Sequence, residues 1–268
     1  MPELPEVETT RRGIEPYLIG QTIHRIDVRD RRLRWPIAKN INAKLSGARI
    51  QSVDRRGKYL LCRTDRGALI IHLGMSGSLR VLPDSRLPGR HDHYDIVLNN
   101  RCTVRYNDPR RFGSLHFAVN PGAHRLLAKL GPEPFDDDFN GAYLKTQARG
   151  RTVAIKNFIM NASVVVGVGN IYASESLFKA RIHPGRAAGR ISAKRLQRLS
   201  ESIKTVLASS IEQGGTTLRD FVGSDGSPGY FGQSLAVYDQ PECPACGTAV
   251  RRSVLGQRAT YHCPSCQR

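Results

Sequence analysis

The sequence lacks any apolar run long enough to cross a membrane, and its first residues are acidic and proline-rich rather than basic and then apolar. A membrane-spanning helix needs about 20 mostly apolar residues, and a secretory signal needs a basic start followed by an apolar stretch. The two absences argue against a membrane or secreted protein. We therefore expect a cytoplasmic protein with no membrane partner.

Cysteine and lysine are both scarce. Only six cysteines occur in 268 residues, and four of them fall at the C-terminal end of the sequence. So few cysteines do not make a disulfide scaffold, and their clustering favours a metal site. There are nine lysines against 32 arginines, so a lysine near a candidate site carries more information than an arginine.

Acidic residues are outnumbered as well. Asp and Glu total 23 against 41 for Lys and Arg, which gives a net charge of +18 and a sequence pI of about 10.2. A pI above about 9 is typical of proteins that bind nucleic acid. Basic ribosomal and membrane-surface proteins share this feature, so the charge suggests a polyanionic partner without selecting one.

The chain opens with two prolines and three glutamates in eight residues, Met1–Glu8. A methionine followed by proline is readily trimmed, which leaves Pro2 with a free secondary amine. Such an amine can attack the anomeric carbon of a sugar and form an iminium, which is an electron sink. Val7, Thr10 and Ile14 follow at helical spacing, so a helix starts after Pro2, and its positive end disfavours protonation of the amine. Glutamate in a first turn is also an ordinary helix start, and this stretch alone leaves both interpretations open.

The following hundred residues contain short runs of Ile, Val, Leu and Tyr separated by turn residues, which predicts a β-sandwich or barrel. A hairpin turn is expected at Asn99-Asn100. The expected strands are Thr22–Val28, Lys58–Arg63, Ala68–Leu73, Ser78–Leu82, Tyr94–Leu98, Thr103–Tyr106 and Ser114–Phe117.

Three stretches of this β region have unusual composition. Basic residues surround a glycine in Arg55–Tyr59, glycines flank Met75, and the loop Asn107–Gly113 combines two arginines with a phenylalanine. Arginine suits phosphates and base edges, and phenylalanine can stack on bases or wedge between them. A strand edge, a core methionine and a surface loop are the ordinary alternatives. His91-Asp92-His93 resembles a metal pair, but no third ligand is near, so we interpret it as a phosphate or structural contact.

Pro, Gly and an acidic run at Gly131–Asp138 predict a domain boundary. The Gly-x-Gly turn of Val166–Ile171 suits a phosphate at a helix start, although close packing explains it equally well. The Gly-rich stretch Gly214–Gly232 is of a length that is usually functional or disordered. Amphipathic helices are expected at 153–159, 172–180 and 192–213.

The strongest single motif is a pair of Cys-x-x-Cys units at the end of the chain. Its ligands are Cys243, Cys246, Cys263 and Cys266. This spacing fits tetrahedral zinc, and four thiolates leave no open position for a catalytic water. The residues between the two units predict a hairpin that turns near Gly256, with Arg258 near its tip.

Together these stretches resemble the formamidopyrimidine-DNA glycosylase family, bacterial enzymes that excise oxidised purines from DNA. The resemblance runs end to end, through Pro2–Glu6, Gly57-Lys58, Asp108–Gly113, Val168–Tyr172 and the cysteine finger. It implies an α+β fold: an N-terminal helix with a two-sheet β-sandwich, a helix–two-turn–helix domain and a C-terminal zinc-finger β-hairpin. The implied domains are 1–130, 131–232 and 233–268.

The resemblance also implies roles for single residues. Pro2 attacks the sugar and forms a Schiff base, Glu3 assists ring opening as an acid, and Glu6 helps to hold the site. Lys58 is a proton donor and phosphate contact in β-elimination, and Arg258 serves δ-elimination.

The implied partner is double-stranded DNA with an oxidised purine or abasic site, bound between the two halves of the chain with the target nucleotide flipped out. The protein would act as a monomer in the cytoplasm, associated with the nucleoid, and would hold one structural zinc ion. The 214–232 stretch matches the loop that closes over the damaged base. Met75, Arg110 and Phe112 match the residues that fill the gap and read the opposite base, and His91, Arg151 and Asn170 match backbone contacts.

One departure is Arg151, which stands where lysine is often found and keeps the charge with a different geometry. An endonuclease VIII-like enzyme for oxidised pyrimidines is the nearest alternative, but Leu4 and the Asp108–Gly113 loop favour the purine enzyme. A catalytically silent zinc-finger DNA-binding protein is the other alternative. A retained Met1 or a blocked Pro2 would favour that silent protein.

Overall fold

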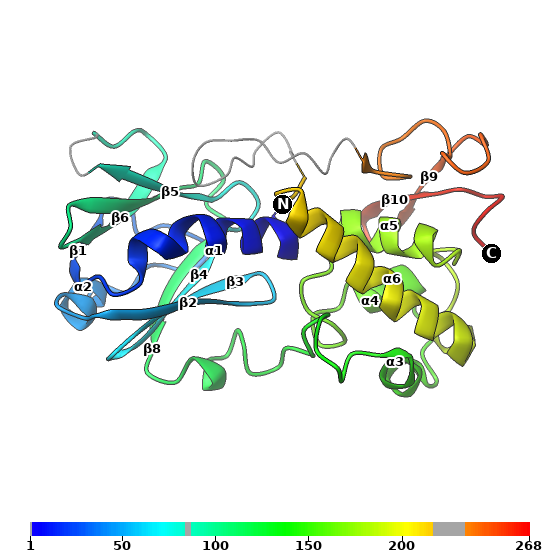
Figure 1. The fold of residues 1–268 in the computed structure, drawn as a ribbon, viewed down its shortest axis with the longest axis horizontal. Coiled ribbons are helices and arrows are strands. Elements are labelled where there is room, and N and C mark those ends of the chain that lie inside the picture. The colour runs from blue at the N-terminus through cyan, green and yellow to red at the C-terminus, as the bar shows by residue number, and fades with distance from the viewer. Residues whose placement is uncertain (1, 84–86, 217–233) are drawn as a thin grey trace. The chain divides into compact units, whose positions relative to one another are not determined.

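A computed structural model describes residues 2–83, 87–216 and 234–268 (Figure 1). The chain divides into two compact units. The first comprises the described residues of 1–128 and 213–230, and the second those of 129–212 and 231–268. The division into three domains at residues 130 and 232 remains a prediction. No helix in the described part of the chain is both long and apolar enough to cross a bilayer.

The first unit is built from two four-stranded antiparallel sheets, with strand orders β1-β6-β7-β5 and β2-β3-β4-β8. This is the two-sheet sandwich that the resemblance implied, and with the helical second unit it confirms the α+β class. The elements are α1 (Leu4–Leu18), β1 (Ile23–Val28), α2 (Ile41–Leu45), β2 (Ile50–Arg56), β3 (Tyr59–Thr64), β4 (Gly67–His72), β5 (Ser78–Pro83), β6 (Asp92–Leu98), β7 (Cys102–Asn107), β8 (Ser114–Ala118) and the 3-10 turn η1 (Pro121–Ala123).

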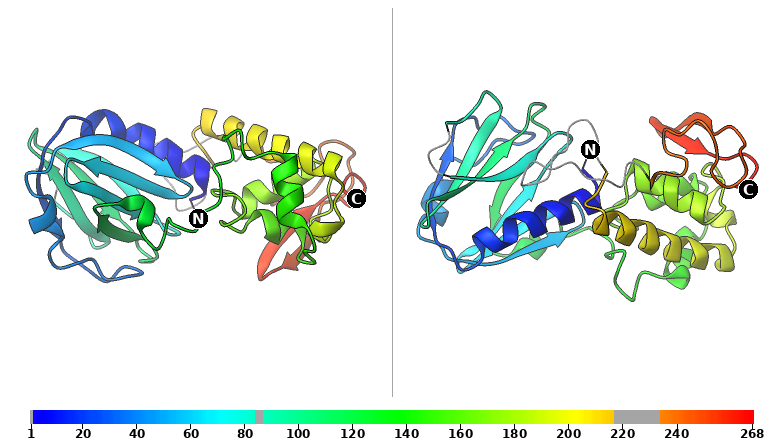
Figure 2. Two further views of the ribbon diagram at one scale, coloured as in Figure 1. Left: turned by 90° about the horizontal axis from the view of Figure 1, so that it is seen from below. Right: turned by 45° about the horizontal axis from the view of Figure 1, so that its top comes forward.

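The helix α1 packs on both sheets, because it contacts β2 and β3 of one and β5 of the other (Figure 2). Its residues Val7, Ile14 and Leu18 are almost fully buried in the hydrophobic core of the sandwich. β2 and β5 are edge strands, and a helix laid over such an edge protects it from pairing with other chains. The helix that carries Glu6 and directly follows Pro2 and Glu3 is therefore fixed along its length.

All seven expected strands are present, with ends shifted by one or two residues, and the Asn99-Asn100 turn joins β6 to β7. The strand β2 was missed because, of its seven residues, only Ile50 and Val53 are apolar. The short helices α2 and α3 (Gly141–Ala148) were also missed. Their stability comes from packing rather than from a long apolar period.

The second unit is helical, with a terminal two-stranded hairpin. Its longest helix, α6, contacts α3 and α5, and α5 in turn contacts α4 and β10. The helices predicted near 153–159, 172–180 and 192–213 are confirmed. The elements are α3, α4 (Ile155–Ile159), α5 (Asn170–Lys179), the 3-10 turn η2 (Ala188–Arg190), α6 (Ala193–Glu212), β9 (Arg251–Leu255) and β10 (Arg258–His262).

Candidate functional site

Two buried carboxylates lie at the head of α1, next to Pro2. Pro2 is buried, Glu3 is the N-cap residue, and Glu6 is the third residue of the helix. Only 3% of Glu3 and 0% of Glu6 is exposed, and the Glu3 N–H donates to Glu6 Oε2 over 2.8 Å. Two carboxylates that are costly to bury are therefore kept together beside Pro2 at one helix end, which is typical of a site rather than of a scaffold.

The second oxygen of Glu6 binds a distant part of the chain. Glu6 Oε1 accepts hydrogen bonds from the backbone N–H of Thr216 at 2.9 Å and from its hydroxyl at 2.7 Å. Gly215, with φ of +83°, lies so close that an added Cβ would be 3.2 Å from Glu6 Oε1. Glu6 thus fixes residues 215–216 against the head of α1, and its role in holding the site stays a prediction. Most of the predicted lesion loop, 217–232, lies outside the described residues.

Lys58 lies in the two-residue turn that joins β2 to β3, where Arg56 pairs with Tyr59. Gly57 precedes it with φ of +57°, the left-handed conformation that such hairpin turns require and that glycine adopts without strain. Burial, together with the positive charge of Lys58, lowers the pKa of the neighbouring His72 to about 4. The half-buried lysine is therefore held at the tip of a regular hairpin.

The loop with the two arginines is organised by one buried acid, Asp108, which is 0% exposed. Its Oδ1 accepts from the Ser76 hydroxyl at 2.7 Å and from the Arg110 N–H at 3.2 Å. Its Oδ2 accepts from the Tyr106 hydroxyl at 3.1 Å and from the Gly113 N–H at 2.9 Å. One carboxylate thereby joins this loop to the turn that contains Met75.

The structure brings together the three residues predicted to enter the DNA. Arg110 is exposed, Phe112 is 45% exposed, and the guanidinium of Arg110 lies 5.3 Å from the centroid of the Phe112 ring. Met75 is half-buried on the adjoining turn. The neighbouring Arg111 instead pairs with Asp30 at 2.8 Å, which leaves Arg110 as the arginine that faces solvent.

The glycines of these two turns permit their close approach. A Cβ on Gly74 would lie 2.4 Å from the Gly113 nitrogen, and a Cβ on Gly113 would lie 1.7 Å from the Tyr106 hydroxyl. Both distances are far below van der Waals contact, and the nearest neighbours of Gly74 are backbone atoms that cannot move aside. Gly74 and Gly113 therefore allow the two turns to pack closely against each other. The sequence did not indicate this role.

In the second unit, Asn170 is the first residue of α5 and its side chain is bound to a buried lysine. Lys156, 0% exposed, donates to Asn170 Oδ1 at 2.7 Å, to the Ala259 carbonyl at 2.8 Å and to the Thr260 hydroxyl at 2.8 Å. Ala259 and Thr260 belong to β10, the strand that begins at Arg258. A single ammonium group therefore fixes the start of α5 and the hairpin in one arrangement.

Other predicted contacts lie where a partner can reach them. Arg258 is exposed beside the turn of the β9–β10 hairpin, as the sequence indicated, and Arg151 is exposed before α4. His91 is half-buried, and its carbonyl accepts from the Asp108 N–H at 3.0 Å. His93 is 1% exposed and bound to the Asp108 carbonyl at 2.7 Å, which makes it a structural histidine.

The four predicted metal ligands form one cluster, with all sulfur atoms within 4.8 Å of one another. Three of the sulfur–sulfur separations are 3.9 Å for Cys243–Cys266, 3.5 Å for Cys246–Cys263 and 3.5 Å for Cys246–Cys266. A tetrahedron with Zn–S bonds of about 2.3 Å has edges of about 3.8 Å. The thiolates therefore fit one zinc ion at the open end of the β9–β10 hairpin, and the expected structural cofactor is supported.

The remaining cysteines lie outside this cluster. Cys62 is buried on β3, and burial raises the pKa of its thiol to about 12. Cys102 is half-buried at the start of β7.

Comparison with known families gives two matches that cover most of the chain. The N-terminal domain of formamidopyrimidine-DNA glycosylase matches residues 1–115, and the H2TH domain of formamidopyrimidine-DNA glycosylase matches residues 130–222. The protein is thus of the class that combines this N-terminal domain with an H2TH domain.

Individual relatives cover the whole chain. Formamidopyrimidine-DNA glycosylase of Stutzerimonas stutzeri is 57% identical over 100% of both chains. The crystal structure of the MutM (Fpg) protein from Thermus thermophilus has a TM-score of 0.89 and 40% identity, over 99% of this chain and 98% of that one. The Lactococcus lactis Fpg in complex with DNA that contains an abasic site has a TM-score of 0.91 and 32% identity, over 99% of each chain. The chain belongs to the formamidopyrimidine-DNA glycosylase family.

Several buried polar residues were not predicted individually. Glu8, Lys156 and Glu175 bind backbone or side-chain groups of segments that are distant in the sequence. The Glu175 carboxylate accepts three consecutive N–H groups of residues 236–238, at 2.8, 3.0 and 2.8 Å. Burial raises the pKa of Glu175, although these hydrogen bonds oppose the rise. The scarcity of lysine was the one signal that pointed toward Lys156.

Proposed function

We propose that this protein is a base-excision repair enzyme that removes oxidised purines from duplex DNA and then nicks the strand at the abasic site. Membership of the family and the abasic-site complex of the Lactococcus lactis relative support the proposal. The observation that carries it is the head of α1, where a buried proline lies beside two buried carboxylates. A trimmed Pro2 there is a secondary amine in a site that is protected from water.

The first step is attack by the Pro2 nitrogen on C1′ of the damaged nucleotide. The bond from C1′ to the base breaks, and its electron pair leaves with the base, which takes up a proton. Glu3 donates a proton to the ring oxygen, the sugar ring opens, and C1′ and Pro2 form an iminium. General acid catalysis of this kind contributes about 10²–10⁴-fold.

The iminium makes the C2′ hydrogen acidic. Loss of that proton forms a C2′–C3′ double bond and breaks the C3′–O bond, and the 3′ phosphate leaves with the electron pair in β-elimination. Lys58 serves as the proton donor and phosphate contact in this step. Arg258 assists δ-elimination, which breaks the C5′–O bond. Hydrolysis of the remaining iminium by water then frees Pro2.

Membership of the family supports the assignment of the DNA contacts. Met75 fills the space of the flipped nucleotide, Phe112 wedges into the adjacent base step, and Arg110 reads the orphaned base. His91, Arg151 and Asn170 contact phosphates, and the cysteine finger holds the hairpin that presents Arg258. The enzyme acts as a cytoplasmic, nucleoid-associated monomer on double-stranded DNA, and 8-oxoguanine and ring-opened purines are the substrates.

The test is borohydride trapping on duplexes that each contain one lesion. The parent protein should give a covalent protein–DNA species, and Pro2→Gly should trap far less because a primary amine replaces the secondary one. Glu3→Gln should retain DNA binding and lose base excision. Mass spectrometry of the mature N-terminus is the control, since a retained Met1 blocks the amine. No trapped species from a correctly trimmed parent would refute the mechanism, and excision restricted to oxidised pyrimidines would favour the endonuclease VIII-like alternative.

A further inference from the structure

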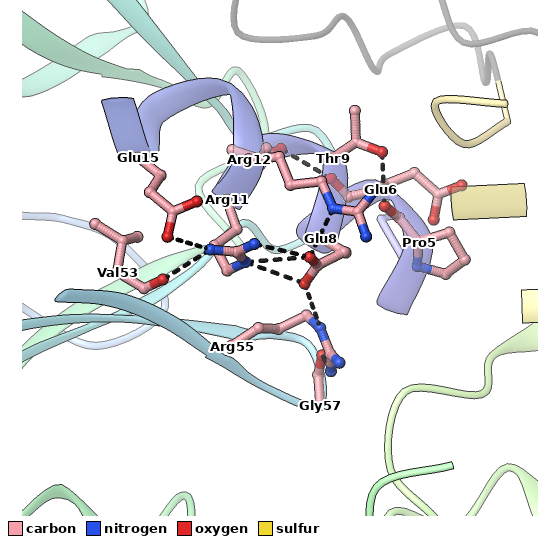
Figure 3. Close-up of polar contacts among 11 residues, drawn as sticks. Pro5, Glu6, Glu8, Thr9, Arg11, Arg12, Glu15, Val53, Arg55 and Gly57 are labelled. Carbon is pink, nitrogen blue, oxygen red and sulfur yellow. Dashed lines mark hydrogen bonds and ion pairs between the residues drawn. The ribbon is translucent and has the colours of Figure 1, made fainter. Parts of the chain in front are cut away.

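A third glutamate of the opening motif, Glu8, binds several arginines on the face of α1 that packs against β2 (Figure 3). Only 9% of Glu8 is exposed, and its carboxylate accepts from Arg11 Nη2 at 3.1 Å, from Arg12 Nε at 2.9 Å and from Arg55 Nε at 3.0 Å. Burial alone raises the pKa of Glu8, but hydrogen bonds from Arg11 and Arg12 and the charge of Arg55 hold it below its usual value. The group is therefore a buried anion with matched donors.

The three arginines that bind Glu8 connect it to different parts of the chain. Arg12 is 57% exposed and belongs to α1 itself. Arg11 donates to the Val53 carbonyl at 3.1 Å and pairs with Glu15 at 2.7 Å, so it ties the helix to the middle of β2. Arg55 is 11% exposed and lies near the end of β2, next to the turn that carries Lys58.

Arg55 completes a connection from the helix to that turn. Its Nη1 donates to the Gly57 carbonyl oxygen at 3.1 Å while its Nε is held by Glu8 (Figure 3). The carbonyl of Gly57 and the nitrogen of Lys58 belong to one planar peptide group. Fixing the carbonyl direction therefore fixes the direction in which the Lys58 backbone leaves the turn.

We propose that Glu8 is a positioning residue that acts through Arg55 and sets the Lys58 turn relative to the head of α1, where Pro2 lies. The proposal rests on the proposed function, in which Pro2 and Lys58 act on the same sugar. A rigid helix carries one group, a two-residue turn carries the other, and the planar guanidinium of Arg55 is a directional link between them. A displacement of about 1 Å at such a site can cost on the order of 10²-fold in rate.

The proposal is tested with Glu8→Gln and Arg55→Lys. Glutamine keeps the size of Glu8 but turns an amide group toward arginine donors, and lysine keeps the charge of Arg55 but cannot bind Glu8 and Gly57 with one fork. The matched control is Arg12→Lys, which changes a ligand of Glu8 that does not reach the turn.

The measurements are single-turnover strand nicking on a pre-formed abasic site, borohydride trapping on the same DNA, and DNA affinity. We expect Glu8→Gln and Arg55→Lys to slow nicking about 10- to 100-fold, with trapping and affinity within about twofold of the parent. The ratio of trapped to nicked DNA should rise, whereas Arg12→Lys should match the parent. The double variant should be no slower than the slower single variant, because both changes break one link.

Equal losses of trapping and nicking in both variants would mean general damage to the fold, and an unchanged ratio would mean that the link does not matter; either result overturns the proposal. If Glu8→Gln does not fold, Arg55→Lys alone decides. Failure of the parent to trap or nick DNA would instead refute the proposed function, so the two failures are distinguishable.

Discussion

Three side chains have separate roles at the surface where DNA is proposed to bind. Arg110 and Phe112 belong to one loop and Met75 to the adjoining turn, all fixed by the buried carboxylate of Asp108. Of the three, only Arg110 offers hydrogen-bond donors. The orphaned base left by nucleotide flipping has edges that are costly to leave unpaired, so Arg110 is the residue suited to reading it.

We expect Arg110→Ala to lower excision of 8-oxoguanine and to narrow the preference for cytosine over adenine in the opposite strand. The pairing edge of cytosine offers two adjacent acceptors, N3 and O2, that suit two guanidinium donors, whereas the pairing edge of adenine offers the single acceptor N1. Met75→Ala should lower excision about as much, with little change in the ratio of excision opposite cytosine to excision opposite adenine. Single-turnover excision from duplexes that differ only in the opposite base measures both, and a parental ratio in Arg110→Ala would contradict the assignment.

A second residue, His72, makes the free energy of unfolding depend on pH. Its Nδ1 accepts from the Gly74 N–H at 3.0 Å, and burial lowers its pKa to about 4, aided by the charges of Lys58 and Arg34. The unfolded chain therefore binds this proton more readily than the folded one. The contribution of His72 to the free energy of unfolding is fully present above about pH 6.5 and is lost as the pH falls toward about 4.

The check is the free energy of unfolding of the parent and of His72→Gln between pH 6.5 and 5. The parent should lose more stability over this range, by at most about 1.4 kcal/mol per pH unit. The pKa of His116 is also lowered to about 4. Because His116 is present in both proteins, its effect on stability is the same in both and cancels in the comparison. Parallel pH profiles would exclude His72 as the titrating group.

At the scale of elements, the β9–β10 hairpin depends on the metal at one end and on Lys156 along its length. β9 is largely exposed, and β10 buries only Thr260 and His262, so the hairpin has little core of its own. Metal binding is therefore expected to supply much of its folding free energy.

We expect one zinc ion per chain. Removing the zinc, or the substitution Cys246→Ala, should unfold the hairpin that carries Arg258 and so abolish specific DNA binding. Cys102→Ala is the matched control, because it removes a half-buried thiol outside the cluster and should leave zinc content and binding unchanged. Elemental analysis and equilibrium binding measure the two effects. Active protein without metal would refute the structural role of zinc.

At the scale of the whole molecule, the net charge of +18 makes binding depend on salt. Each neutralised phosphate contributes about −0.9 to the slope of log affinity against log salt concentration on B-DNA. Arg151→Ala should reduce the steepness of that slope by about one such contribution, with the lesion preference nearly unchanged.

Arg25→Ala is the matched control, because this arginine is already paired with Asp27 at 2.8 Å and its removal should alter the slope less. Affinity for lesion and undamaged duplexes across a salt series gives both quantities. An altered preference with an unaltered slope would show that Arg151 does not act as a backbone contact.

The sequence by itself determined the fold class, the strands with clear apolar alternation and the zinc ligands. These features depend on local periodicity and spacing, as in Cys243–Cys246, or on a motif long enough to be specific, as at Pro2–Glu6. The weakly apolar strand β2 escaped this reasoning because its position is set by pairing with β3.

Only the tertiary structure decided which polar residues are buried and what they bind. Glu8 and Arg55 are 47 positions apart, and Lys156 and Thr260 are 104 apart. No local pattern marks such pairs, because a charged side chain in sequence is ordinarily a solvated one. It becomes a structural anchor only when folding removes its water and supplies matched partners in exchange.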